Sequence, residues 1–100
     1  MTPEAKVKQK VRLVLERYGA YYTMPVTGGY GASGVPDFIC CYHGRFIGVE
    51  CKAGSNTPTA LQLNNMKRID WAGGRTVVIN ETNISDLETL LKEIEREETK

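Results

Sequence analysis

The stretch GVPDFICCYHGRFIGVECK, residues 34–52, decides the fold of this chain. Its two runs, 35–42 and 45–52, are rich in β-forming residues, and each predicts a strand. Between them stand His43 and Gly44, a two-residue link typical of a type I′ turn, in which glycine adopts a positive φ at little cost. We therefore expect an antiparallel hairpin.

The turn sets the register of this hairpin, because each strand is counted back from it. The expected pairs are Tyr42 with Arg45, Cys40 with Ile47, Phe38 with Val49 and Asp37 with Glu50. Directly opposed residues have Cβ atoms about 5 Å apart, and two carboxylates at that separation repel by roughly 3 kcal/mol at an effective dielectric constant near 20. Lys52 projects from the same face as Glu50, since side chains alternate along a strand. The pattern predicts a site for a hard cation with an ammonium group beside it.

A plainer interpretation of the same residues is structural. Glu50 and Lys52 could form an ion pair on one face of the strand, while Asp37 caps a turn after Pro36. A β-bulge between Asp37 and Glu50 would also weaken the argument from register. Two opposed carboxylates in an otherwise apolar hairpin favour the cation site.

These residues also resemble a known signature. Pro36-Asp37 followed by Glu50-Cys51-Lys52 is similar to the PD-(D/E)xK signature of nucleases, and the surrounding residues resemble the virus-type replication-repair nuclease (VRR-NUC) domain. The resemblance runs from Glu4 to about Ile79. It rests on an ordered set of features: Glu4 in the first helix, Gly34-Val35-Pro36-Asp37, the strand 47–52, and Thr59 with Gln62. It implies an α/β fold with a restriction-endonuclease-like core, a mixed β-sheet flanked by helices on both sides.

The resemblance further implies metal-dependent hydrolysis of phosphodiester bonds. Asp37 and Glu50 would hold Mg²⁺ or Mn²⁺, hard cations that prefer carboxylate oxygens, and the backbone carbonyl of Cys51 would be a further ligand. Lys52 would orient a water molecule or stabilise developing charge. The catalytic residues that the resemblance implies are Asp37, Glu50, Lys52, Glu4 and Gln62.

Glu4 and Gln62 each have a second interpretation. Glu4 could simply be a favourable charge at a helix N-terminus, and Gln62 could be an ordinary capping amide. The resemblance favours roles near the metal, through bridging water, for both residues.

The remaining elements follow from caps and periodicity. Thr2 and Pro3 predict the start of a first helix, and Gly19 predicts its end. We expect a short strand at 21–26, a helix capped near Thr57 that runs to about residue 72 with Trp71 in the core, and a central strand at 76–79. Residues 85–88, Ser-Asp-Leu-Glu, read as a capping box for a last helix. The stripe of Leu87, Leu90, Leu91 and Ile94 on that helix either covers the sheet or docks on a second copy of the chain.

The charge of the chain is uneven, although its net charge is only +1. Basic residues exceed acidic ones in 1–80, and the reverse holds in 81–100, which is compatible with a phosphate-binding face. The candidate nucleic-acid contacts are Lys6, Lys10, Tyr30, Lys67 and Arg68. Tyr30 stands in the Gly-rich segment 27–34, which is either a surface connection or a loop that approaches substrate.

One hundred residues predict a single domain spanning 1–100. The sequence lacks an apolar run long enough to span a membrane and a signal-like segment, so we expect a cytoplasmic protein of a bacterium or a phage-infected cell. The three cysteines form no zinc or disulfide pattern and are expected to be reduced, buried thiols.

The function that these features favour is a structure-selective DNA endonuclease. The resemblance suggests a Holliday-junction-resolvase-like enzyme of repair or recombination, and the small size of the chain suggests a twofold-symmetric homodimer on branched DNA. The alternative is a module that binds branched DNA or a protein without cutting. Cleavage of RNA on the same catalytic core stays open.

Overall fold

The structure is a computed structural model, and it describes residues 1–26 and 34–98. The helices and strands of these residues are α1 (Pro3–Tyr18), β1 (Tyr21–Thr23), β2 (Phe38–Tyr42), β3 (Arg45–Cys51), α2 (Ala60–Trp71), β4 (Arg75–Ile79) and α3 (Ile84–Glu98).

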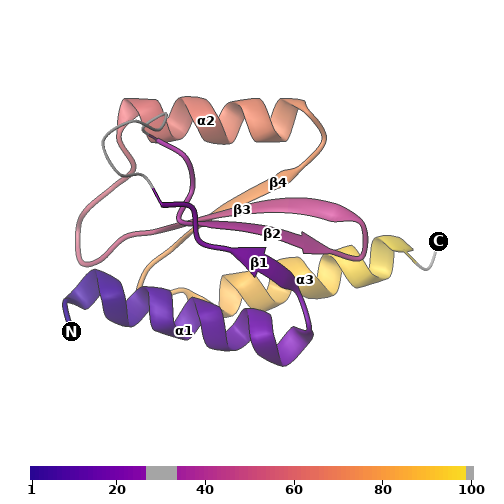
Figure 1. The fold of residues 1–100 in the computed structure, drawn as a ribbon, viewed down its shortest axis with the longest axis horizontal. Helices are drawn as coiled ribbons and strands as arrows, with labels where there is room; N and C mark the ends of the chain where they lie inside the picture. The colour runs from indigo at the N-terminus through magenta and orange to yellow at the C-terminus, as the bar shows by residue number, and fades with distance from the viewer. Residues whose placement is uncertain (27–33, 99–100) are drawn as a thin grey trace.

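The strands form one mixed sheet in the order β1-β2-β3-β4. The pairs β1/β2 and β2/β3 are antiparallel, whereas β3 and β4 are parallel and are connected through α2. Helix α2 lies on one face of the sheet, and α1 and α3 lie on the other (Figure 1). The expected sheet with helices on both sides is therefore confirmed.

The hairpin of β2 and β3 has the predicted register. Phe38 pairs with Val49, and the pairing continues to Tyr42 and Arg45 at the turn. His43 and Gly44 both have positive φ, as a type I′ turn requires. The regular ladder stops at the Phe38–Val49 pair, so Asp37 lies just outside it.

The hydrophobic core lies between the sheet and the two helices α1 and α3. Helix α1 begins after Thr2, whose side chain accepts a hydrogen bond from Ala5 N, and it ends at Gly19 in the left-handed conformation, as expected. The largest core side chains come from all of these layers: Val7, Val11, Leu15, Phe38, Ile47, Val49, Ile79, Leu87, Leu91 and Ile94. The stripe on α3 therefore covers the sheet, which decides between its two interpretations.

Helix α2 is less buried than α1, and the prediction that Trp71 lies in the core is wrong. No residue of α2 is buried, and Trp71, expected in the core, is 93% exposed. Among the described elements the helix packs mainly on β3 and β4, so no residue of it is buried. Its cap is Thr59, two residues beyond Thr57, because Thr59 and Gln62 complete the capping box.

Other boundaries also differ from expectation. Strand β1 ends at Thr23, and β4 is an edge strand rather than a central one, because it pairs only with β3. Ser85 lies inside α3, and Glu88 bonds Arg17 and Tyr18 instead of closing a capping box.

The cysteines are reduced, as expected, but Cys41 is exposed whereas Cys40 and Cys51 are buried. Within 1–26 and 34–98, no helix combines the length and the apolar character needed to cross a membrane.

Candidate active site

The candidate site lies where β3 ends. Glu50 and Cys51 are its last residues and Lys52 follows it, while Asp37 immediately precedes β2. The N-terminal ends of α1 and α2 lie at the same end of the sheet (Figure 1). Segments that are distant in the sequence therefore converge here.

Tight packing positions the segment that carries Asp37. Gly34 has φ +92, and a Cβ at this position would lie 2.8 Å from the backbone of Leu61 on α2, so only glycine fits. Pro36 packs over Gly48, where an added Cβ would meet its Cγ at 3.0 Å. Asp37 is thus held between β3 and the first turn of α2.

Asp37 hydrogen-bonds the backbone of β3. Its Oδ2 accepts a bond of 2.8 Å from Cys51 N, and its Oδ1 lies 3.6 Å from Lys8 Nζ. The carboxylate therefore caps the end of the hairpin, one position beyond the regular pairing. Part of the structural interpretation is observed, and it coexists with a carboxylate pair, since Asp37 remains close enough to Glu50 to affect its pKa.

The carboxylate of Glu50 is 2% exposed. Its Oε2 accepts a hydrogen bond of 2.9 Å from Gln62 Nε2 and lies 3.5 Å from Lys52 Nζ. Its Oε1 is buried and has no hydrogen-bond partner in the part of the chain that the structure describes. Buried carboxylate oxygens almost always have a partner, so one acceptor position is open.

Burial and, after it, the negative charge of Asp37 raise the pKa of Glu50 to about 7, against the opposing effect of Lys52. A divalent cation would reverse this balance by stabilising the ionised carboxylate. Burial also raises the pKa of the Cys51 thiol to about 12, so that its side chain stays neutral.

Gln62 bonds both the start of α2 and the candidate site with one amide. Its Oε1 accepts a bond of 2.8 Å from Thr59 N, which closes the capping box of α2. Its Nε2 donates to Glu50. The start of α2 is thereby connected directly to the buried carboxylate.

Glu4 reaches the site through a lysine that the sequence analysis missed. Lys8 Nζ lies 3.8 Å from Glu4 Oε2 and 3.6 Å from Asp37 Oδ1, so it bridges the two carboxylates. The spacing of four residues between Glu4 and Lys8, which places both on one face of a helix, was the available signal.

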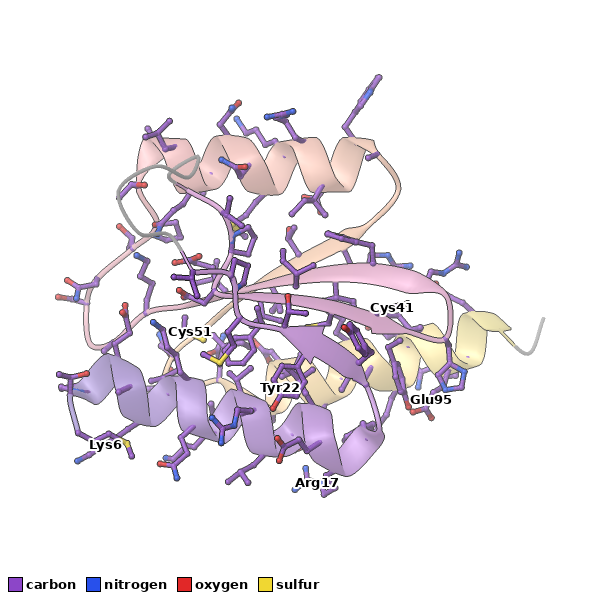
Figure 2. The ribbon with its side chains drawn as sticks, in the orientation of Figure 1. Lys6, Arg17, Tyr22, Cys41, Cys51 and Glu95 are labelled. Atoms are coloured by element: carbon purple, nitrogen blue, oxygen red, sulfur yellow. The ribbon has the colours of Figure 1, made fainter. Side chains whose placement is uncertain are left out.

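The predicted nucleic-acid contacts are dispersed. Lys6 and Lys10 lie on another side of α1, where they line a hollow with Gly54 and Glu81. Figure 2 shows Lys6 extending outward from α1, while Cys51 lies inside, between this helix and the sheet. Lys67 and Arg68 are exposed on α2, and Tyr30 lies outside the described residues.

The donor atoms suit one hard cation. No group of three or more Asp, Glu, His or Cys side chains could hold a metal within the described ranges, so Asp37 and Glu50 would need a backbone ligand. Lys52 N donates to Ile79 O in β4, and a trans peptide directs the preceding carbonyl the opposite way. The Cys51 carbonyl therefore faces the side of β3 on which Asp37 lies. With the open Glu50 Oε1, these oxygens fit Mg²⁺ or Mn²⁺.

These observations define a mixed α/β sandwich in which the buried carboxylate of Glu50 and the partly exposed carboxylate of Asp37 lie at the end of the hairpin. The chain has the fold of a VRR_NUC domain: a solved structure of that description matches it with a TM-score of 0.69, covering 96% of this chain and 94% of that one at 21% identity. The resemblance seen in the sequence is thus confirmed at the level of the fold.

A phage relative points the same way. The protein named "Putative nuclease p44", from Acyrthosiphon pisum secondary endosymbiont phage 1, is 34% identical over 58 residues, which cover 57% of this chain. The matched region spans 62% of the relative's length. No family model matches the chain.

Proposed function

We propose that this chain is a metal-dependent nuclease that hydrolyses phosphodiester bonds in DNA. The observation that carries the proposal is the open Oε1 of Glu50, a buried carboxylate oxygen beside Asp37 that has no partner among the described residues. An open carboxylate oxygen beside a second carboxylate is a suitable ligand for the divalent cation that metal-assisted phosphoryl chemistry uses. The VRR_NUC fold and the name of the phage relative support the same activity.

Each residue of the site has a distinct task in this proposal. Asp37, Glu50 and the Cys51 carbonyl would hold Mg²⁺ or Mn²⁺, which supplies charge neutralisation and a lowered water pKa. Lys52, on the same face as Glu50, would orient the attacking water and stabilise charge on the phosphate. Gln62 would keep Glu50 in one rotamer through its bond to Oε2.

Lys8 and Glu4 form the other side of the site. The ammonium of Lys8 balances the charge of Asp37 before a cation binds, and it stands where a phosphate oxygen of the substrate would approach the carboxylates. Glu4 holds Lys8 from one helical turn away. We assign both residues to positioning rather than to direct ligation.

We further propose that the substrate is branched DNA, that the enzyme acts as a Holliday-junction-type resolvase in repair or recombination, and that it works in the cytoplasm of a bacterium or an infected host. A homodimer would present two sites to one junction. The outer surface of α2 supports a dimer, because Trp71 is 93% exposed and Leu61 and Leu63 are about half exposed, and tryptophan is enriched at interfaces.

The decisive experiment compares cleavage of labelled four-way junction, flap, duplex and single-stranded DNA in Mg²⁺ or Mn²⁺. Asp37→Asn keeps an acceptor for Cys51 N and should bind without cutting. Asp70→Asn is the matched control, because Asp70 bonds Thr76 on β4 and not the site. If wild type cuts no DNA or RNA in either metal, the non-cleaving binding module replaces the nuclease. Preference for flaps over junctions would remove the resolvase role alone.

A further inference from the structure

The sheet face that carries Glu50 is only half covered. Helix α2 packs mainly on β3 and β4, so no described helix covers the same face of β1 and β2. Tyr21 is directly opposite Cys41, and Cys41 is directly opposite Phe46, so these three side chains form a row across three strands. Tyr21 is 70% exposed, Phe46 is 45% exposed and Cys41 is exposed. Two aromatic rings and one thiol thus form the floor of a groove on this part of the sheet.

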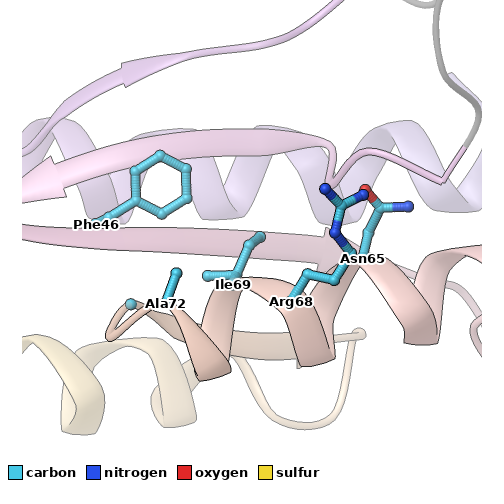
Figure 3. A pocket seen from close by; sticks show the side chains of 6 residues that line it. Phe46, Asn65, Arg68, Ile69 and Ala72 are labelled. Atoms are coloured by element: carbon cyan, nitrogen blue, oxygen red, sulfur yellow. The ribbon is translucent and has the colours of Figure 1, made fainter.

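The flank of α2 forms a wall beside this floor. A hollow of about 510 Å³ separates Phe46 from the helix. Its lining residues are Phe46, Asn65, Arg68, Ile69, Ala72 and Gly74. Figure 3 shows Phe46 standing across from the side chains of α2. None of these residues is acidic, and the guanidinium of Arg68 has no ion pair or hydrogen bond within the described part of the chain.

This groove lies on the same sheet face as the candidate active site, with Pro36 and Ile69 packed over Gly48 between the two. Phe46 precedes Glu50 by four residues on β3, so both point to the same face. At about 3.3 Å per residue they lie roughly 13 Å apart, a span of about four stacked bases at 3.4 Å each. Asn65, which also lines the groove, is one helical turn from Gln62.

We propose that this groove binds an unpaired stretch of the nucleic-acid strand beside the cleavage position, with bases stacked on Phe46 and Tyr21 and a phosphate on Arg68. The inference rests on the proposed nuclease function, and among branched substrates it favours those with a single-stranded flank, such as a flap, over a fully paired four-way junction. Aromatic side chains reach base faces only where the bases are unstacked from a duplex.

The charge of the groove favours this occupant over an apolar protein segment. Arg68, unpaired among residues 1–26 and 34–98, is a cation at the rim of an aromatic floor, the combination that single-strand-binding grooves use for backbone and bases. A second copy of this chain would have to bring a carboxylate or an aromatic ring to Arg68. That possibility is an outcome of the test below.

Binding can be measured without cleavage in an Asp37→Asn background, by anisotropy of a labelled duplex with a single-stranded flank and of a blunt duplex. Phe46→Ala should weaken binding of the flanked duplex by roughly fivefold or more and leave the blunt duplex unchanged. Phe46→Tyr keeps an aromatic face and should restore affinity. Leu13→Ala is the matched control, since Leu13 is an exposed apolar residue of α1.

Arg68→Gln should weaken binding of the flank and reduce its salt dependence. Lys92→Gln on α3, an exposed cation on the other side of the sheet, should do neither. Saturation with the flank should also slow alkylation of Cys41, while the buried Cys40 and Cys51 stay unreactive as internal references.

The possible failures are distinguishable. Unchanged affinity of Phe46→Ala together with an unprotected Cys41, in a protein that cleaves DNA, would overturn this inference and leave the nuclease intact. Protection of Cys41 that rises with protein concentration alone would assign the groove to a second copy and also overturn it. Strand binding with the expected losses, but no cleavage by wild type in Mg²⁺ or Mn²⁺, would support the groove and refute the proposed function.

Discussion

Raising the pH of the metal-free protein should weaken its fold, because Glu50 must ionise while it is buried. Its pKa is raised from an ordinary value of 4.5 to about 7, chiefly by burial and then by the charge of Asp37. This shift in pKa corresponds to a loss of roughly 3 kcal/mol in the free energy of unfolding. A loss of that size is a large fraction of the stability of a small domain.

The direction follows from proton binding. Between about pH 4.5 and pH 7 the unfolded chain has lost the proton of Glu50, whereas the folded protein retains it. The folded state therefore binds more protons, and the free energy of unfolding falls as pH rises through this window. The full loss is present above about pH 7. Measurements should stay below the range in which unfolded cysteines ionise, because burial raises the pKa of Cys40 and Cys51 to about 12 in the fold.

The assay is urea denaturation of the metal-free protein at several pH values, from about pH 5 to about pH 8. Glu50→Gln is the control, since it retains a polar group for Gln62 but does not titrate; its stability should change little over this range. Adding Mg²⁺ or Mn²⁺ near pH 8 should restore wild type by about 2.7 kcal/mol at one hundred times the dissociation constant, and should leave Glu50→Gln unchanged. Wild-type stability that rises with pH, or an equal metal response in the variant, would refute this account of Glu50.

Three further outcomes are expected. Gln62→Ala should lower the free energy of unfolding by about 1 to 2 kcal/mol, because it removes half of the capping box and the bond to Glu50. Gln62→Glu should keep the cap and lower stability mainly above about pH 7. Equal urea midpoints for wild type and Gln62→Ala would contradict this. Lys8→Ala should lower kcat/KM for cleavage roughly tenfold while Lys6→Ala changes it less than twofold, and equal effects would argue against the contact of Lys8 with Asp37. Trp71→Ala should change monomer stability by less than about 0.5 kcal/mol but weaken the proposed dimer in sedimentation equilibrium, and a large loss of stability would show that this side chain is packed.

The candidate cation site shows how much of a site can be predicted from local sequence pattern. Register follows from a two-residue turn and from alternation along the strands, so the approach of Asp37 to Glu50 could be predicted. The backbone at the end of the ladder could not, because Asp37 turns toward Cys51 N only where regular pairing stops. Lys8 was missed for a related reason: three lysines alternate along the start of α1, and only the position of Asp37 selects one of them.

The sequence by itself determined the hairpin, the first helix with its caps, and the apolar stripe of the last helix, but not whether that stripe covers the sheet. These features depend on turn chemistry, capping and periodicity, which act between residues close in the chain. Only the tertiary structure decided that α2 covers half of a sheet face, that β4 is an edge strand, and that Trp71 is exposed. How much of a helix is buried depends on how wide a surface lies beneath it. Here β3 and β4 are too narrow to bury α2, and the uncovered half of the sheet forms a groove on the face that carries Glu50.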